Sequence, residues 1–346
     1  MLALRTKPSE TEKAKTYLLK HRGYNKDYKI LNKNPYIYLP LASDIKPAVL
    51  SHASRAFHAK AIETKLEPIA HPTEYRKSLM SALGSSYEKA VKSYDLFGNI
   101  AVIDAEPQVA LKMSKVILST NKNVETVLRK GGAVSGVYRT RKHAYVAGKR
   151  NYIATYKENG CTFVFDVRKV FFSTRLAYER DRISKLVKSK ENVIVMFAGA
   201  GPFAIEIAKR QPKANVIAME LNPYGCTAMR SNIKLNKTDN VSAERGDVAK
   251  LSSKHPRFAN RVIMPLPKTA FEYLKDVAKV AANSCVMHYY AFGQSDSVFE
   301  TESKRVVSFF TKAGFSARVL NKRVVRPYSS REVEICLDVS LKRDIE

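Results

Sequence analysis

Residues 193–223 alternate between short apolar runs and one amphipathic segment. The run VIVMF is followed by a glycine-containing turn, by the segment FAIEIAKR with apolar residues at helical spacing, and by the run NVIAME. Short apolar runs bounded by turn residues are typical of buried strands, and spacings of three to four residues are typical of helices. The stretch predicts strand, turn, helix and strand. The same alternation continues to the C-terminus, which indicates a doubly wound α/β domain over residues 166–346.

The last two apolar segments depart from this alternation. ARVLNKRVVR and EVEICLDVSL have no helical pattern between them and are joined by a short connection through Pro327. A connection this short can join antiparallel strands but not parallel ones. We therefore expect an antiparallel hairpin at the end of an otherwise parallel sheet.

Residues 1–60 form the first of two smaller α+β regions that we expect before this domain. The segment SETEKAKTYLLKHRGY predicts a helix that begins with a capping box between Ser9 and Glu12. DYKILNKNPYIYLPL then alternates as a short hairpin does. The frequent lysines are compatible with RNA contact or with a purely structural extension.

Residues 61–165 form the second region. SYDLFGNIAVIDA predicts strands around a turn at Gly98 and Asn99, and CTFVFDVRKVFF predicts a strand that leads into the third region. The helix expected over PQVALKMSKVILSTN has apolar residues available to a core face. These are Val109, Leu111, Val116 and Ile117.

The composition indicates what kind of partner the protein binds. The 346 residues contain 60 Lys and Arg against 32 Asp and Glu, a net charge of +28, and 45% of residues are apolar. The apolar content supports folded cores, and the charge favours a polyanion such as nucleic acid as partner. A lysine-rich surface selected for solubility or heat tolerance is the alternative.

The cysteines and the apolar runs narrow the class of protein. The four cysteines contain no C-x-x-C pair, which argues against a zinc ribbon or a disulfide framework. No apolar run approaches the ~18 residues of a membrane span, and MLALRTKPSETEKAK becomes charged too early for a signal peptide. We therefore expect a soluble, cytoplasmic monomer without a metal. The cysteines are Cys161, Cys226, Cys285 and Cys336.

The glycine turn predicts a nucleotide-type ligand. Gly199, Gly201 and Ala204 form the pattern G-x-G-x-x-A, and Glu220 follows about twenty residues later, where an acid binds ribose hydroxyls. The turn lacks the G-K-[ST] of a P-loop. It could place a pyrophosphate on the following helix, which Pro202 begins, or let S-adenosylmethionine approach the backbone closely. The turn alone does not decide between them.

The rest of the domain favours S-adenosylmethionine over a dinucleotide. Asp247 follows the third strand, where an acid suits recognition of an adenine amino group. Pro265, Leu266 and Pro267 follow the fourth strand, at the sheet edge where α/β domains bind ligands. This order fits a methyltransferase better than a dehydrogenase.

Several segments resemble the tRNA (guanine-37-N1)-methyltransferase family of archaea and eukaryotes. They include FDVRKVFFSTRLAYERDRI, MFAGAGPFAIEIA, IKLNK, IMPLPKTAFEYL and MHYYAF, and the resemblance extends upstream through SYDLFGNIAVI and VYRTRKHAYVAG. It implies an N-terminal domain that grips the tRNA body and a middle domain that holds the anticodon stem-loop. It also implies a Rossmann-like C-terminal domain that transfers a methyl group from S-adenosylmethionine to N1 of guanosine 37.

The expected site residues fall into two groups. The cofactor is expected at Arg180, Phe197, Gly199, Gly201, Glu220, Leu221, Asn222, Asp247, Val248 and Pro265. RNA contacts are expected at Arg139, Arg141, Lys142 and Arg175.

The reaction requires a base and a cation near one purine ring. N1 of guanine carries a proton at neutral pH, and charge moves towards O6 when that proton is lost. The resemblance implies Glu179 as the base. Its side chain could instead form a surface ion pair with Arg175 or Arg182 at helical spacing. Arg139 is the candidate partner of O6, although it could also bind phosphate or exchange roles with Arg141.

Two positions depart from the family pattern. Val195 stands where relatives usually have Asp, and Pro265 stands where they usually have Asn. Proline at the second position is similar to an archaeal subgroup that also methylates C7 of 4-demethylwyosine in tRNA-Phe, giving isowyosine. The resemblance thus implies a second activity. Pro265 could offer an apolar wall to a tricyclic base, or it could simply shape the turn.

Other interpretations remain. His288, Tyr289 and Tyr290 could stack on bases or pack inside a strand, and Arg326 and Tyr328 are weaker candidates for RNA contact. The protein could be the related aminocarboxypropyl transferase of wyosine synthesis, or an RNA-binding protein with a decayed cofactor pocket. The segment RLAYER favours methyl transfer, and the retained glycines, Glu220 and Asp247 argue against decay.

Overall fold

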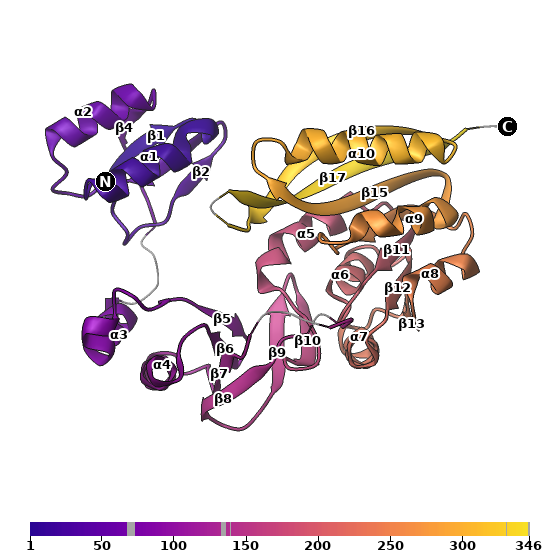
Figure 1. Ribbon diagram of the computed structural model, residues 1–346, viewed down its shortest axis with the longest axis horizontal. Coiled ribbons are helices and arrows are strands. Elements are labelled where there is room, and N and C mark those ends of the chain that lie inside the picture. The colour runs from indigo at the N-terminus through magenta and orange to yellow at the C-terminus, as the bar shows by residue number, and fades with distance from the viewer. Residues whose placement is uncertain (68–72, 133–135, 139, 330, 345–346) are drawn as a thin grey trace. The chain divides into compact units, whose positions relative to one another are not determined.

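The chain divides into two compact units, Met1–Ser81 and Ala82–Glu346 (Figure 1). The computed structural model describes residues 1–67, 73–132, 136–138, 140–329 and 331–344. The boundary expected at residue 60 falls at the start of a strand, Lys60–Glu63, that pairs with the first strand of the chain. The first unit therefore extends further. Residues 82–165 cluster with the C-terminal domain instead of forming a separate unit.

The first unit is an antiparallel sheet of four strands in the order β2-β3-β1-β4. Helices α1 and α2 bury Leu18 and Ala53 in one core cluster with Leu4 and Leu39 of the sheet. The predicted hairpin is confirmed, because β2 pairs antiparallel with β3. The elements are β1 (Leu2–Thr6), α1 (Pro8–Lys20), β2 (Leu31–Lys33), β3 (Tyr36–Pro40), α2 (Pro47–Ala56) and β4 (Lys60–Glu63).

Helix α1 begins earlier than the sequence indicated. Its N-cap is Lys7, and Pro8 occupies the first helical position, where the missing N–H of proline costs no hydrogen bond. The expected capping box was wrong, because Ser9 already lies inside the helix. Thr11 takes part at this end instead: its hydroxyl donates to the Lys7 carbonyl over 2.9 Å.

The second unit begins with a mixed sheet in the order β5-β6-β7-β8. The predicted turn at Gly98 and Asn99 joins β5 to β6. A Cβ on Gly98 would lie 1.8 Å from the Thr155 carbonyl oxygen of β9 (Ile153–Glu158), so only glycine fits there. Helix α3 (Thr73–Leu83) crosses from the first unit into the second. The elements that follow it, through the last strand of this sheet, are η1 (Gly84–Ser86), β5 (Tyr94–Phe97), β6 (Ile100–Ile103), α4 (Pro107–Thr120), β7 (Thr126–Lys130) and β8 (His143–Gly148).

Helix α4 faces the core with a slightly different set of residues from the predicted one. Val116 and Ile117 are buried as expected, but Leu111 is 50% exposed. Ala110 and Met113 are buried in its place. The apolar stripe of the helix is therefore rotated by one position relative to the prediction.

The C-terminal domain is a seven-stranded sheet in the order β13-β12-β11-β14-β15-β17-β16. Strands β11 to β15 run parallel, and the predicted antiparallel hairpin of β16 and β17 is confirmed. The strands are β11 (Asn192–Met196), β12 (Asn215–Glu220), β13 (Val241–Arg245), β14 (Ala259–Met264), β15 (Ala281–Gln294), β16 (Phe315–Pro327) and β17 (Glu332–Arg343).

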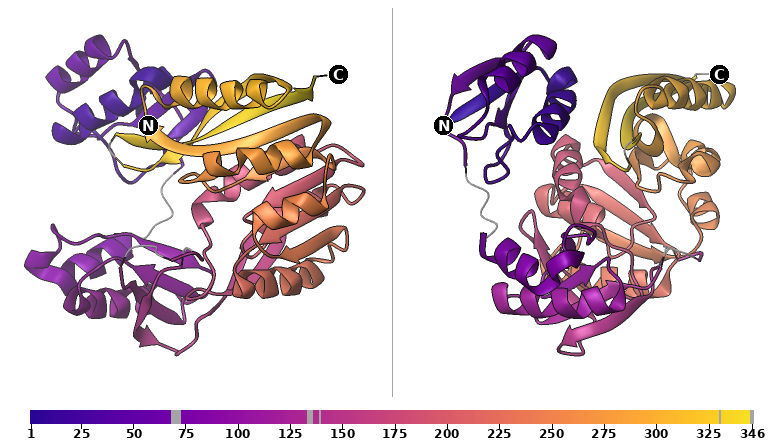
Figure 2. Two further views of the ribbon diagram at one scale, coloured as in Figure 1. Left: turned by 45° about the vertical axis from the view of Figure 1, so that its right-hand side comes forward. Right: turned by 60° about the vertical axis from the view of Figure 1, so that its left-hand side comes forward.

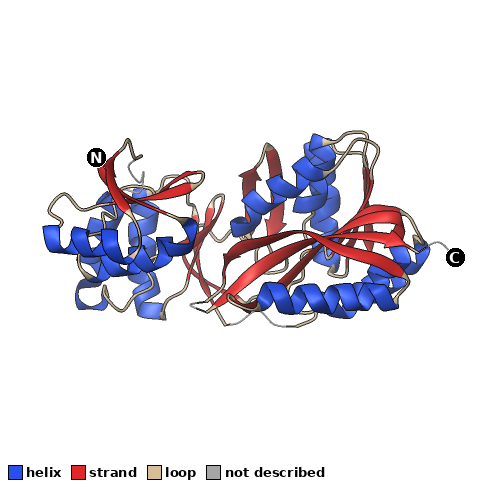
Figure 3. Cartoon of the chain, turned by 90° about the horizontal axis from the view of Figure 1, so that it is seen from above, coloured by secondary structure: helices blue, strands red, loops and turns tan. Residues whose placement is uncertain are grey.

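Helices cover both faces of this sheet (Figures 2 and 3). Along β11, Val193 and Val195 join the core with α5, α6 and α7, whereas Ile194 and Met196 join the core with α8, α9 and α10. This alternation gives the three-layer α/β architecture that the sequence predicted. The helical segments are η2 (Thr174–Leu176), α5 (Ala177–Leu186), α6 (Pro202–Arg210), α7 (Pro223–Asn236), α8 (Val248–Leu251), η3 (Ser252–Lys254), η4 (Ala270–Tyr273), α9 (Leu274–Val280) and α10 (Val298–Lys312).

Two buried amides attach the hairpin of β9 (Ile153–Glu158) and β10 (Cys161–Asp166) to α7. The Asn236 side chain accepts from the Thr162 N–H over 2.8 Å and donates to the Thr162 carbonyl over 2.7 Å. Asn232 accepts from the Val164 N–H over 2.8 Å. Side chains of the segment NIKLNK thus satisfy the edge of β10, where unpaired backbone groups would otherwise be buried.

The structure also describes the cysteines and the apolar character of the helices. All four cysteines are buried and free. Within the described ranges, no helix combines the length and the apolar character that crossing a bilayer requires.

Candidate functional site: a cofactor-type cavity and a basic cavity

The strand order places a ligand site at the carboxyl end of β11. From β11 the sheet continues in one direction through β12 and β13, and in the other through β14 and β15. The connections that leave β11 and β14 therefore diverge and open a crevice at the edge of the sheet. The glycine turn follows β11 at this switch point.

The glycine turn depends on left-handed backbone conformations. Phe197, Gly199 and Gly201 have φ angles of 57°, 59° and 87°. A Cβ on Gly201 would lie 2.8 Å from Cγ of Met229 in α7. Gly201 therefore allows α6 to pack closely on α7, and the cofactor contact expected at this residue stays a prediction.

Glu220, at the end of β12, holds the glycine turn in place. One carboxylate oxygen accepts from the Gly199 N–H over 2.6 Å, and the other accepts from the Asn222 N–H over 2.7 Å. Burial raises the pKa of Glu220, and these backbone hydrogen bonds oppose that rise. Each carboxylate oxygen has a further lone pair, so both can still accept ligand hydroxyls.

A cavity of about 510 Å³, here called the cofactor-type cavity, opens between the glycine turn, Glu220 and the turn after β14. Its volume is in the range of small-molecule sites. Nine of the ten residues expected at the cofactor line it, all except Gly201: Arg180, Phe197, Gly199, Glu220, Leu221, Asn222, Asp247, Val248 and Pro265.

Asp247 and Pro265 face this cavity from the ends of β13 and β14. Asp247 is exposed, and one of its oxygens caps α8 by accepting from the Ala249 N–H over 2.8 Å. Pro265 begins a tight turn in which the Leu266 N–H donates to the Met264 carbonyl over 2.8 Å. Pro265 thus shapes the turn and also contributes an apolar wall.

Val195 does not line the cofactor-type cavity. It is fully buried on β11, in the core cluster shared with α5, α6 and α7. Glu220 and the backbone of the turn supply the contacts that orient the turn: Ala198 donates to the Met219 carbonyl over 2.9 Å, and Gly201 to the Ala198 carbonyl over 2.9 Å. The turn is therefore held without an acid at position 195.

Arg180 lines the cofactor-type cavity, and its charge is balanced by a buried acid. It is 2% exposed, and its guanidinium contacts Glu158 at 2.6 Å and Glu206 at 3.4 Å. It also donates to the Ser173 carbonyl over 3.0 Å. Burial, more than the nearby Glu158, raises the pKa of Glu206 to about 8. The cluster thus fixes the Arg180 side chain between two acids.

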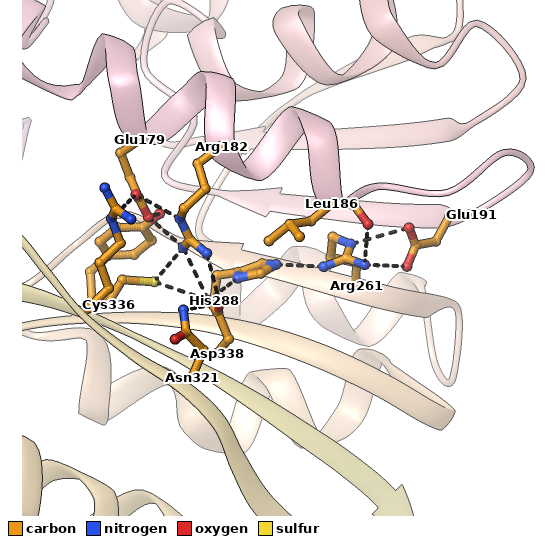
Figure 4. A network of polar contacts seen from close by, with 11 residues as sticks. Glu179, Arg182, Leu186, Glu191, Arg261, His288, Asn321, Cys336 and Asp338 are labelled. Atoms are coloured by element: carbon orange, nitrogen blue, oxygen red, sulfur yellow. Dashed lines mark hydrogen bonds and ion pairs between the residues drawn. The ribbon is translucent and has the colours of Figure 1, made fainter. Parts of the chain in front are cut away.

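Glu179 is held inside a buried network and does not line either described cavity (Figure 4). Its carboxylate accepts two hydrogen bonds from Arg182, over 2.7 and 2.9 Å, and one from the Tyr290 hydroxyl over 2.8 Å. The alternative of an ion pair with Arg182 is therefore the observed state, but the pair is buried and not on the surface.

The same network continues across the sheet from Arg182. Arg182 donates to Asp338 over 2.8 Å, and Asp338 contacts Nδ1 of His288 over 2.6 Å. Arg261 donates to Nε2 of His288 over 2.7 Å, so Nδ1 carries the proton of the neutral ring. His288, Tyr289 and Tyr290 are at most 2% exposed, so they are packing residues and do not stack on RNA.

A second cavity of about 460 Å³, here called the basic cavity, is lined by Arg141 and Arg175. Both were expected to contact RNA. Lys142 is exposed and lies outside the lining, and Arg139 lies outside the described residues. Burial, followed by the charges of Arg141 and Lys130, lowers the pKa of His143 to about 4, so this lining residue is neutral at pH 7.

The basic cavity also contains residues that the sequence did not single out. Asp95, Lys130 and Lys268 line it. Each lies near a strand end or in a loop, where the sequence shows that a residue is charged but not which way its side chain points. The cavity shares walls with the cofactor-type cavity through Val170, Phe171, Phe172, Ser173, Lys268, Phe292 and Arg326.

Comparisons with known proteins agree with this geometry. Residues 154–320 match the TRM5/TYW2 methyltransferase domain. The tRNA (guanine(37)-N(1))-methyltransferase Trm5b of Pyrococcus abyssi is 32% identical over 340 residues, which cover 97% of this chain and 98% of that protein. The crystal structure of Pyrococcus abyssi Trm5b superposes with a TM-score of 0.70 over 99% of both chains.

Two further relatives bear on the ligands. The tRNA 4-demethylwyosine(37)-methyltransferase Taw21 of Saccharolobus solfataricus is 32% identical over 203 residues, 58% of this chain and 77% of that protein. The crystal structure of Methanocaldococcus jannaschii Trm5 in complex with adenosine has 27% identity and a TM-score of 0.67, and covers 100% of both chains. With a relative this similar along almost its whole length, the chain belongs to the TRM5/TYW2 methyltransferase family.

Proposed function

We propose that the protein transfers a methyl group from S-adenosylmethionine to N1 of guanosine 37 in tRNA. The observation that carries this proposal is the pair of cavities with a shared wall, one suited to the cofactor and one lined by cations. The relative from Pyrococcus abyssi, which matches along the whole chain, is named for this reaction.

The residues around the first cavity fit S-adenosylmethionine. Glu220 offers carboxylate lone pairs for the two ribose hydroxyls, and Asp247 offers an acceptor for the adenine amino group. Phe197, Leu221 and Val248 supply apolar surface for the adenine. When bound, the cofactor supplies an electrophilic methyl group on a sulfonium, and the protein supplies its orientation.

The partner that we propose is tRNA. The net charge of +28 favours a polyanion, and Arg141 and Arg175 place cations beside the cofactor-type cavity. We propose that residues 82–165 hold the anticodon stem-loop, that the N-terminal unit, Met1–Ser81, holds the tRNA body, and that the enzyme acts as a cytoplasmic monomer.

The base that removes the N1 proton is proposed to be Glu179, with Arg139 as partner of O6. This assignment rests on the resemblance of the segment RLAYER. Because Arg182 and Tyr290 hold the Glu179 carboxylate, its action on a base requires the side chain to leave these partners when tRNA binds. Until then they keep the carboxylate from the solvent.

We further propose a second activity, C7 methylation of 4-demethylwyosine in tRNA-Phe. Two observations favour it: Pro265 presents an apolar wall to the cofactor-type cavity, and Taw21 is a relative over more than half of this chain. An amide at position 265 would need hydrogen-bond partners on the bound base. The proline ring needs none, so the tricyclic base can pack against it.

The proposed reaction is tested by incubating the protein with S-adenosylmethionine and tRNA that carries unmodified guanosine 37. We expect 1-methylguanosine in the nucleoside digest, and no product when adenosine replaces guanosine 37. Mass analysis separates this product from the larger aminocarboxypropyl adduct. An aminocarboxypropyl product, or methylation elsewhere in the tRNA, would contradict the proposal.

Glu179→Gln should affect both stability and rate. Loss of the carboxylate removes one of the two buried acids that pair with Arg182, the other being Asp338, which should lower the free energy of unfolding by at most about 3–5 kcal/mol. The single-turnover rate of folded enzyme should fall by about 10²- to 10⁴-fold because the general base is lost.

Arg182→Met is the matched control for Glu179→Gln, because it breaks the same ion pair and keeps the carboxylate. We expect Arg182→Met to lose stability while its folded fraction retains most of the rate. Equal rates in the two folded variants would assign Glu179 to the network alone.

Pro265→Asn should change the ratio of the two activities. We expect the variant to favour guanosine over 4-demethylwyosine by about tenfold relative to the wild type, which is the effect of about one hydrogen bond. The ratio is measured with the two tRNAs in competition. An unchanged ratio would show that Pro265 only shapes the turn.

A further inference from the structure

Asp95 joins two cations across the basic cavity. Its side chain comes from β5 and contacts Nζ of Lys130, at the end of β7, over 3.1 Å. Its other oxygen contacts the Arg175 guanidinium, in η2, over 2.9 Å. All three residues line the cavity, and Asp95 thus connects the mixed sheet to the segment that precedes α5.

The side chains of Asp95, Lys130 and Arg175 differ in their exposure to solvent. The Lys130 and Asp95 side chains are 18% and 23% exposed, whereas the Arg175 side chain is 60% exposed. Burial alone raises the pKa of Asp95, but hydrogen bonds from Lys130 and Arg175 bring it below its usual value. Asp95 is therefore an anion at neutral pH and restrains one side chain that is largely open to solvent.

The charge around the cavity exceeds what Asp95 neutralises. Lys130, Arg141, Arg175, Lys268 and Arg326 line the cavity as cations, of which Arg326 is paired with Glu334 at 2.6 Å, and His143 is neutral there. Asp104 also lies 3.6 Å from Lys130, but its side chain is 63% exposed. A surplus of cations around a cavity suits a phosphate group, because guanidinium and ammonium groups bind phosphate oxygens with charge-assisted hydrogen bonds.

We propose that Lys130 and Arg175 clamp one phosphodiester of the RNA strand next to the target nucleotide, and that Asp95 is the positioning residue of this clamp. The proposal rests on the proposed function, because the basic cavity shares a wall with the cofactor-type cavity. Asp95 fixes the separation of the two cations before RNA arrives, so less side-chain entropy is lost when the phosphate binds.

A purely structural role for the same residue makes different predictions. If Asp95 only ties the mixed sheet to η2, its replacement should lower stability and leave RNA recognition by the folded protein unchanged. If Asp95 positions a clamp, its replacement should weaken recognition of one phosphate in particular. The two roles are therefore separated by measuring binding at a single linkage.

The test uses full-length Asp95→Asn, Lys130→Ala and Arg175→Ala with an anticodon stem-loop RNA. Each cation variant should bind RNA with a salt dependence whose logarithmic slope is smaller by about 0.7–0.9, because one phosphate contact is lost. Asp95→Asn should raise KM for tRNA about tenfold with kcat nearly unchanged, and Asp95→Glu should restore part of the loss.

Asp181→Asn is the matched control. Asp181 lies on α5 outside both cavities, bridges Lys185 and Arg210 in the same way, and its side chain is 20% exposed. The substitution changes the net charge by the same amount as Asp95→Asn. We expect it to leave KM and the salt slope at wild-type values.

The decisive comparison uses stem-loops with one neutral methylphosphonate linkage on either side of guanosine 37. At one of the two positions, the neutral linkage should weaken RNA binding by the wild type about tenfold. The same linkage should cause no further loss of affinity in Lys130→Ala or Arg175→Ala. An equal cost in wild type and variants would overturn the clamp. Because binding is measured without methyl transfer, absence of 1-methylguanosine would count against the proposed reaction and not against the clamp.

Discussion

The two hydrogen bonds that Glu220 accepts determine the geometry of the cofactor-type cavity. They connect the turn after β11 to the turn after β12 through a single carboxylate, over 2.6 and 2.7 Å. The left-handed backbone of the glycine turn needs such an anchor, since Val195 provides no polar group beneath it. The same carboxylate is the group that the proposed cofactor would contact, so support of the loop and recognition of the ligand depend on one residue.

The second half of the site depends on charges that are paired before any ligand binds. Arg180 is paired with Glu158, Glu179 with Arg182, and Arg175 with Asp95. Buried or restrained pairs of this kind contribute little net stability but fix side-chain positions, and breaking one partner is costly. The protein thus presents its cations in defined places, while the neutral His143 lies among them.

The sequence predicted the layers of the fold better than the directions of its side chains. Apolar alternation in β11 and the short connection through Pro327 were sufficient for the sheet and its terminal hairpin. The capping box at Ser9 was wrong because the helix begins at Pro8, with its N-cap at Lys7, two residues before the predicted one. Glu179 and Asp95 show the limit most clearly, because charge and spacing do not tell whether an acid faces a cavity or a neighbouring arginine.

The central claim is that Glu220 binds the ribose of S-adenosylmethionine, and calorimetric titration of the cofactor product S-adenosylhomocysteine tests it most directly. Glu220→Gln should weaken binding by about 10- to 100-fold, because hydrogen bonds to a charged acceptor are worth about 1.5–3 kcal/mol. A 2′-deoxyribose analogue should bind the wild type more weakly, with little further loss in the variant. Equal affinity of wild type and Glu220→Gln for S-adenosylhomocysteine would contradict the account.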